Sequence, residues 1–233
     1  LLQQRLLRLQ RGFIDLDRLN PPPMISPRSP VRHGTRFVFL GRLAPNKRQD
    51  RLIRLLAAWK PSDPDATLTL IGDDAQHPSW RRRLSAQCQS LGLKEGSDVV
   101  ITGKIGDDEA RRILLDSHVF VSASQHEGFG APLIEAMAFG LPVVAVPAAA
   151  VPGTLDGAGH LLAGASEREW VDEIRGVLDH SPSRWALHAA QQDRLEMFTA
   201  EAGRAQTEAL LARIGNLPPR PAQMPRVSVV INT

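Results

Sequence analysis

The chain has 233 residues, enough for one large domain or for one domain with flanking pieces, and its formal net charge is only +3. Apolar residues make up 42% of it, and no apolar run approaches the length of a membrane span, so the composition is that of a soluble globular segment. The absence of tyrosine and the single cysteine, Cys88, argue against a nucleic-acid surface, a disulfide framework and a cysteine-rich metal site.

Two proline-rich stretches flank the central part of the chain. Five prolines lie between residues 20 and 30, and four more between 218 and 225. This composition is typical of extended linkers, so domain boundaries are expected there. The predicted parts are residues 1–33, with an apolar helix at Leu1–Leu9 and a linker from a missing upstream lobe; residues 34–216, one globular lobe; and residues 217–233, a linker and the first strand of a following domain.

Strand and helix patterns alternate through the central part. Short branched apolar runs bounded by Gly or Pro predict buried strands, and the apolar runs of helical spacing between them predict helices. The predicted strands are Arg36–Leu40, Thr67–Ile71, Val99–Ile101, Val119–Val121, Val143–Val146 and Leu161–Leu162. About six such units predict an α/β fold, a Rossmann-like doubly wound parallel sheet with flanking helices.

Several local signals refine this pattern. Asp107 is expected to cap the helix that follows it, and Ser166 with Glu169 forms a capping box that opens another helix. Residues 147–159 are rich in Ala, Gly and Pro and are predicted to form a loop. Two further helices are expected at Ser183–Leu195 and Glu201–Ile214.

The stretch from residue 125 to 144 joins two predicted strands through a turn and a helix. Gly128 and Gly130 allow close backbone approach to a ligand, and Pro132 suits the first turn of a helix. The free amides and the dipole of that turn favour a phosphate or another anion. Glu127 just before the helix and Glu135 within it then suggest a polyhydroxylated ligand that also carries phosphate.

Arg42 and Lys47 lie on the loop that follows the first predicted strand. This is the carboxyl edge of the sheet, where open α/β sheets bind their ligands. Taken alone, each is better explained as a solvated loop charge. The loop is not a Walker loop, because Lys47 lacks the preceding glycine and is followed by Arg48.

Together these motifs resemble a known family. In register and order over Phe37 to Leu162, the chain is similar to the carboxyl-terminal, donor-binding lobe of a family 4 glycosyltransferase of the GT-B fold. The matching motifs are Gly41-Arg42-Leu43 with Lys47, then Gly103, then Glu127-Gly128-Phe129-Gly130 with Glu135-Ala136-Met137-Ala138, and Gly140-Leu141-Pro142-Val143-Val144. The final residues, Val227 to Thr233, resemble the opening strand of a family 2, GT-A type glycosyltransferase domain.

The resemblance implies roles for particular residues in binding a nucleoside diphosphate sugar. Arg42 and Lys47 would hold the diphosphate, and with Glu127, which would hydrogen-bond the donor sugar, they are the residues implied in catalysis. Glu135 would accept hydrogen bonds from the ribose. The remaining implied donor contacts come from Gly41, Lys104, Ile105, Gly128, Phe129, Gly130 and Leu133.

The resemblance also implies partners and a location. The reaction would be metal-independent, with a UDP-, GDP- or similar nucleotide-sugar as donor, and would retain the anomeric configuration. The acceptor, a glycan or a lipid-linked glycan, would bind the missing lobe, and a neighbouring glycosyltransferase domain would follow. The expected setting is surface polysaccharide synthesis in the cytoplasm, and peripheral membrane contact would place it at the inner face of the membrane. No nucleic-acid partner is expected.

One motif departs from the family pattern, and other functions remain open. Gly153 stands where the family commonly has glutamate in a Pro-Glu turn, which weakens any expectation for that loop. The alternatives are another GT-B enzyme, such as a nucleotide-sugar epimerase or a phosphorylase, and a non-catalytic nucleotide-binding or assembly module. The base, the sugar, the acceptor and the linkage are not determined.

Overall fold

The computed structural model describes residues 16, 19–22, 33–164, 166–178, 182–199, 202, 203, 205, 208 and 209. The predicted helix at Leu1–Leu9, most of the helix at Glu201–Ile214, the second linker and the strand at Val227–Thr233 lie outside these residues. The three-part domain division therefore stays a prediction.

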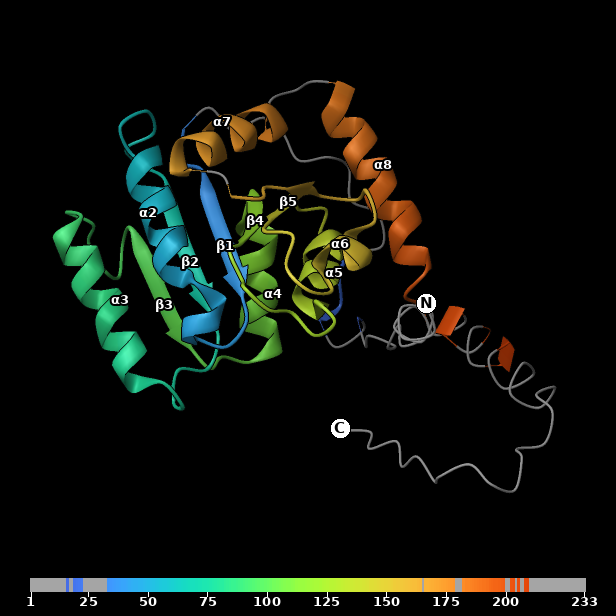
Figure 1. Cartoon of the computed structure of the whole chain (residues 1–233), viewed down its shortest axis with the longest axis horizontal. Helices are drawn as coiled ribbons and strands as arrows, with labels where there is room; N and C mark the ends of the chain where they lie inside the picture. The colour runs from blue at the N-terminus through green and yellow to red at the C-terminus, as the bar shows by residue number, and fades with distance from the viewer. Residues whose placement is uncertain are drawn as a thin grey trace, which may run out of the picture.

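Six parallel strands form one sheet in the order β3-β2-β1-β4-β5-β6 (Figure 1). In β1, Phe37 lies opposite both Leu68 of β2 and Val119 of β4. The chain winds outward from β1 in both directions, which confirms the predicted doubly wound sheet. The strands are β1 (Arg36–Leu40), β2 (Thr67–Ile71), β3 (Val99–Gly103), β4 (Val119–Ser122), β5 (Val143–Ala145) and β6 (His160–Leu161).

Helices cover both faces of the sheet. They are η2 (Pro45–Lys47), α2 (Gln49–Trp59), α3 (Pro78–Ser90), α4 (Asp107–Asp116), α5 (Ala131–Ala138), α6 (Val151–Leu155), α7 (Glu167–Leu178) and α8 (Pro182–Glu196). Because side chains alternate along a strand, Phe37 and Phe39 pack with α2, α3 and α7, whereas Val38 packs with α4, α5 and α6 on the other face. None of the helices in the described part of the chain is both long and apolar enough to cross a membrane.

Two local predictions are wrong. The expected loop at residues 147–159 contains α6, in which Val151 and Leu155 are both fully buried; packing of these two side chains one turn apart favours a helix despite the neighbouring Pro and Gly. Asp107 is the first helical residue of α4 and not its cap, because the cap position falls on Gly106. An acidic residue there still complements the helix dipole.

Another local prediction is confirmed. The capping box closes as expected, since the Glu169 amide donates to the Ser166 hydroxyl at 3.3 Å and the Ser166 amide donates to Oε2 of Glu169 at 2.6 Å. Cys88 is buried in α3 as a small hydrophobic residue, and burial raises the pKa of its thiol to about 11.

Candidate functional site

The loops that follow β1 and β2 are locked together at the carboxyl edge of the sheet. The Gly41 amide donates to Ile71 O and the Leu43 amide to Asp73 O, both at 2.9 Å. Gly72 sits so close to this crossing that a Cβ there would lie 2.0 Å from Gly41 O, and its φ is +154°. These two hydrogen bonds therefore fix the backbone on either side of Arg42.

The loop after β1 also contacts the loop after β4. The Gln125 amide donates to Asn46 O at 2.8 Å, and Lys47 Nζ lies 2.6 Å from Glu127 Oε1 and 3.4 Å from His126 O. The Lys47 and Glu127 side chains are only 14% and 12% exposed. The structure thus brings together two predicted site residues that are 80 positions apart. It can do so because β1 and β4 are neighbours in the sheet.

Residues 127–130, named here the glycine loop, lead directly into α5. Gly130 occupies the cap position with φ +81°, a left-handed conformation that glycine adopts without steric cost, and Pro132 follows in the first turn. Glycine has no side chain with which to cap the helix. Pro132 has no amide and the Leu133 amide donates to Gly130 O at 2.9 Å, so it is mainly the positive end of the α5 dipole that suits an anion here.

Arg42 does not join the Lys47–Glu127 pair. Its side chain is exposed and donates from Nη1 to Gln76 Oε1 at 3.4 Å, while its carbonyl accepts from Nε2 of Gln49 at 2.9 Å. Gln49 is fully buried and also accepts from Trp80 Nε1 at 2.9 Å. Neither glutamine is predicted from the sequence, because a single glutamine carries no motif and its partners are set by the fold.

The other predicted site residues are spread over three places. Lys104 is exposed and Ile105 half-buried on the loop after β3, two strands away from β1. Leu133 and Glu135 are 2% and 4% exposed on α5. Gly128 is exposed, whereas Phe129 is half-buried and its carbonyl accepts from the Thr154 hydroxyl. The ligand contacts of all these residues stay predictions.

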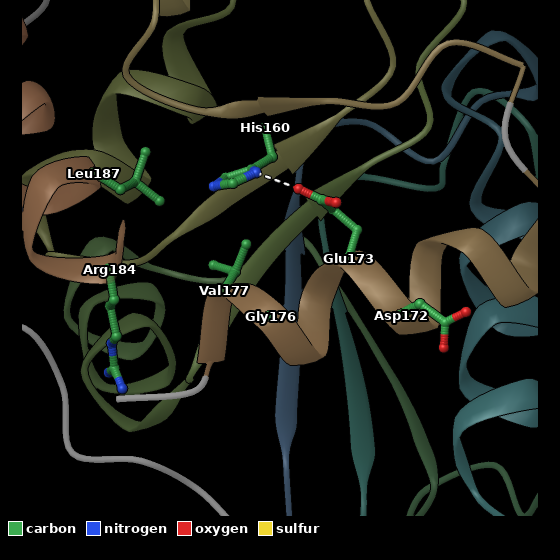
Figure 2. A pocket seen from close by; sticks show the side chains of 7 residues that line it. All are labelled: His160, Asp172, Glu173, Gly176, Val177, Arg184 and Leu187. Atoms are coloured by element: carbon green, nitrogen blue, oxygen red, sulfur yellow. Dashed lines mark hydrogen bonds and ion pairs between the residues drawn. The ribbon is translucent and has the colours of Figure 1, made fainter. Parts of the chain in front are cut away.

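A hollow of about 180 Å³ lies elsewhere, between β6, α7 and α8 (Figure 2). His160 Nδ1 and Glu173 Oε1 meet at 2.5 Å on one side of it. Arg184 is buried and donates from Nη1 to Leu178 O, and in Figure 2 its guanidinium points away from the His160–Glu173 pair. None of the predicted site residues lines this hollow, and we place the candidate site at the strand ends, where Lys47 and Glu127 meet before the start of α5.

Comparison with known proteins gives the family. A family model described as glycosyl transferases group 1 matches residues 29–194, well over half of the chain. The chain belongs to this family. The predicted resemblance to family 4, GT-B glycosyltransferases is therefore confirmed.

Individual relatives fit this assignment. The chain is 30% identical to a D-inositol 3-phosphate glycosyltransferase of Stackebrandtia nassauensis over 174 residues, which is 69% of this chain and 38% of the relative. The crystal structure of Anabaena Alr3699/HepE in complex with UDP and glucose has a TM-score of 0.67 at 24% identity, covering 77% of this chain and 48% of that chain. The C-terminal domain of the Francisella tularensis glycosyl transferase group 1 protein LpcC has a TM-score of 0.64 at 22% identity, covering 80% of this chain and 99% of that domain.

The two solved structures are less than 25% identical in sequence to this chain, so they show similarity of fold alone. The chain spans between 24% and 48% of the length of curated relatives such as these. The reaction that the whole protein catalyses is therefore proposed, not shown.

Proposed function

We propose that this chain is the donor-binding half of a glycosyltransferase that moves a sugar from a nucleoside diphosphate sugar to a glycan or lipid-linked acceptor. The observation that carries the proposal is the 2.6 Å contact between Lys47 and Glu127, the first residue of the glycine loop. A cation and the positive end of a helix dipole suit the diphosphate, and a carboxylate next to them suits the hydroxyl groups of the sugar. Family membership and the UDP and glucose held by the HepE structure support this assignment.

The chemistry expected of these residues is electrostatic. As the bond between the sugar and the diphosphate breaks, negative charge grows on the leaving nucleoside diphosphate, and Lys47 and Arg42 offset it. As part of the proposal, the charges of Lys47 and Arg42 take the place of a metal ion in this reaction. Glu127 and Glu135 position the donor sugar and the ribose and do not serve as a general acid and base.

The remaining features of the reaction follow from the family resemblance and are also proposals. The sugar keeps its anomeric configuration, and the product belongs to a surface polysaccharide made at the inner face of the membrane. The acceptor binds a second lobe, so the chain alone binds donor and does not turn it over. Turnover by the isolated chain would contradict this last point.

Calorimetric titration of the chain with UDP, GDP, UDP-glucose and GDP-mannose tests the proposal. Binding of at least one of these ligands is expected. If none of them binds, the proposal fails.

Replacement of Glu135 tests its predicted contact with the ribose. Glu135→Ala is expected to weaken nucleotide binding by about 1–3 kcal/mol, the cost of leaving a polar contact unmade, as measured by the same titration. Glu173→Ala is the control, because Glu173 pairs with His160 at the hollow and lines no part of the candidate site. Unchanged affinity in Glu135→Ala would remove Glu135 from the site.

A further inference from the structure

A side-chain hydrogen bond from α6 holds the glycine loop. The Thr154 hydroxyl donates to Phe129 O at 2.6 Å, across 25 positions of sequence, and Thr154 is 5% exposed. A Cβ added at Gly128 would meet no atom within 4 Å, so Gly128 gives the loop no packing of its own. The backbone of the loop is restrained by the Thr154 hydrogen bond together with the Ala150 amide, which donates to Glu127 O at 3.2 Å.

This hydrogen bond fixes the direction of a neighbouring amide. The peptide bond between Phe129 and Gly130 is trans, as are all described peptide bonds, and in a planar trans peptide the C=O and N–H point in opposite directions. Because Thr154 holds the Phe129 carbonyl toward α6, the Gly130 amide points away from α6. That amide belongs to the helix start where the donor phosphates are proposed to bind.

Arg194 of α8 in turn holds α6 in place. It donates from Nε to Thr154 O at 2.9 Å and from Nη2 to Gly153 O at 2.5 Å, and its Nη1 lies 3.3 Å from Asp156 Oδ2. These carbonyls belong to the last turn of α6, where a guanidinium complements the helix dipole. A helix of five residues is marginal by itself, so its position depends on such tertiary contacts.

Phe198, two residues after the end of α8, also contacts the glycine loop. The Phe198 ring packs edge-to-face on the Phe129 ring, with centroids 5.9 Å apart, and Phe198 is 2% exposed. The Arg194 guanidinium lies 5.1 Å from the centroid of the Phe198 ring. Both the carbonyl and the side chain of Phe129 are therefore held by one connected set of residues.

We propose that Thr154, Arg194 and Phe198 are positioning residues that set the glycine loop in the geometry needed to bind the donor diphosphate. The inference rests on the proposed function, since it assigns the loop to the donor. None of the three residues needs to touch the ligand. Thr154 and Arg194 act through the Phe129 carbonyl, and Phe198 acts through the Phe129 ring.

The first test replaces Thr154 in the full chain. Thr154→Val keeps the branched shape and removes the hydroxyl, and affinity for the nucleotide that the wild type binds is expected to fall about 3- to 10-fold in calorimetric titration. Thr154→Ser keeps the hydroxyl and is expected to bind within about twofold of wild type. If Thr154 had a purely structural role, Thr154→Val would lower the melting temperature and leave the affinity unchanged.

The second test compares two arginines. Arg194→Lys keeps the charge and loses the forked geometry that joins two carbonyls, so a similar loss of affinity is expected. Arg36→Lys is the matched control: Arg36 also donates Nε to a backbone carbonyl, Asp116 O, and pairs with an aspartate, but at the amino end of β1. Equal affinities in the two variants would overturn the role of Arg194.

A measurement without ligand separates this inference from the proposed function. Amide hydrogen exchange at Gly128, Phe129 and Gly130 is expected to be faster in Thr154→Val than in wild type, and Thr154→Ser is expected to restore the wild-type rate. If wild type binds a nucleotide and the variants bind it equally well, the positioning role is wrong and the proposed function stands. If wild type binds none, the proposed function fails, and the exchange rates alone decide whether these residues hold the loop.

Discussion

Gly72 shows how a residue without a side chain can shape the candidate site. A Cβ on it would overlap Gly41 O, and its φ of +154° is unfavourable for any other residue. The crossing of two loops at this point keeps Arg42 at the carboxyl edge of β1. Gly72 therefore acts on the site by allowing two backbones to approach each other.

Gly72→Ala is expected to lower the free energy of unfolding by more than about 2 kcal/mol and also to weaken nucleotide binding, because the added methyl must displace the backbone at Gly41. Urea denaturation and calorimetry measure the two effects. Gly92→Ala is the control, since Gly92 has φ +69° but no atom within 4 Å of an added Cβ. It is expected to cost about 1–2 kcal/mol and to leave affinity unchanged. Wild-type affinity in Gly72→Ala would show that the loop crossing does not position the site.

At the scale of elements, Asp63 ties the end of α2 to the start of β1. Its carboxylate accepts from the Gly34 amide at 2.7 Å, from the Thr35 amide at 2.8 Å and from Trp59 Nε1 at 3.3 Å. Burial raises the pKa of this carboxyl, but the hydrogen bonds from Thr35, Gly34 and Trp59 outweigh burial and hold the pKa below its ordinary value. The charged form therefore stabilises the folded chain.

The sign of the pH dependence follows from the lowered pKa. The contribution of Asp63 is fully present above the unfolded pKa of about 3.9 and is lost as the pH falls through the lower pKa of the folded state. Asp63→Asn is expected to reduce the free energy of unfolding at pH 7 by about 1.5–3 kcal/mol, the value of hydrogen bonds to a charged group. Urea denaturation at pH 7 and at pH 3 should show the difference between wild type and variant shrinking at the lower pH. A difference that stays constant would show that the charge of Asp63 is not what stabilises this junction.

At the scale of the whole molecule, a residue from before the predicted boundary at 33 packs into the lobe. Leu19 is 1% exposed in the core cluster that contains α4 and α5. Next to it, Asn20 O accepts from Nε of Arg111 at 2.8 Å. Leu19 therefore contributes to the core of the lobe, although the predicted division assigned it to residues 1–33, the part that precedes the lobe.

Leu19→Ala is expected to lower the free energy of unfolding by about 2–5 kcal/mol, as for other buried leucines, in a denaturant titration of the full chain. Leu91→Ala is the control, because Leu91 is 40% exposed at the end of α3 and its loss should cost less than about 0.5 kcal/mol. Equal effects of the two changes would mean that Leu19 adds nothing to the stability of the lobe.

The fold was largely predictable from the sequence, because its signals are local. The runs at Arg36–Leu40 and Thr67–Ile71 are strands with those bounds in the structure, and the Ser166–Glu169 capping box opens α7. Each depends on residues within one strand or one helical turn. The failure at α6 has the same cause, because Pro and Gly indicate a loop locally, whereas burial of Val151 and Leu155 decides for a helix.

By itself, the sequence determined the alternation of strands and helices, the family and the residue types at the candidate site, because short motifs and periodicity specify them. Only the tertiary structure decided which of those residues meet. Lys47 reaches Glu127 because β4 lies beside β1, and Thr154 and Arg194 support the glycine loop because α6 contacts the loop and α8 contacts α6. Such contacts join residues tens of positions apart, and their geometry depends on strand order and helix packing, which no local pattern specifies.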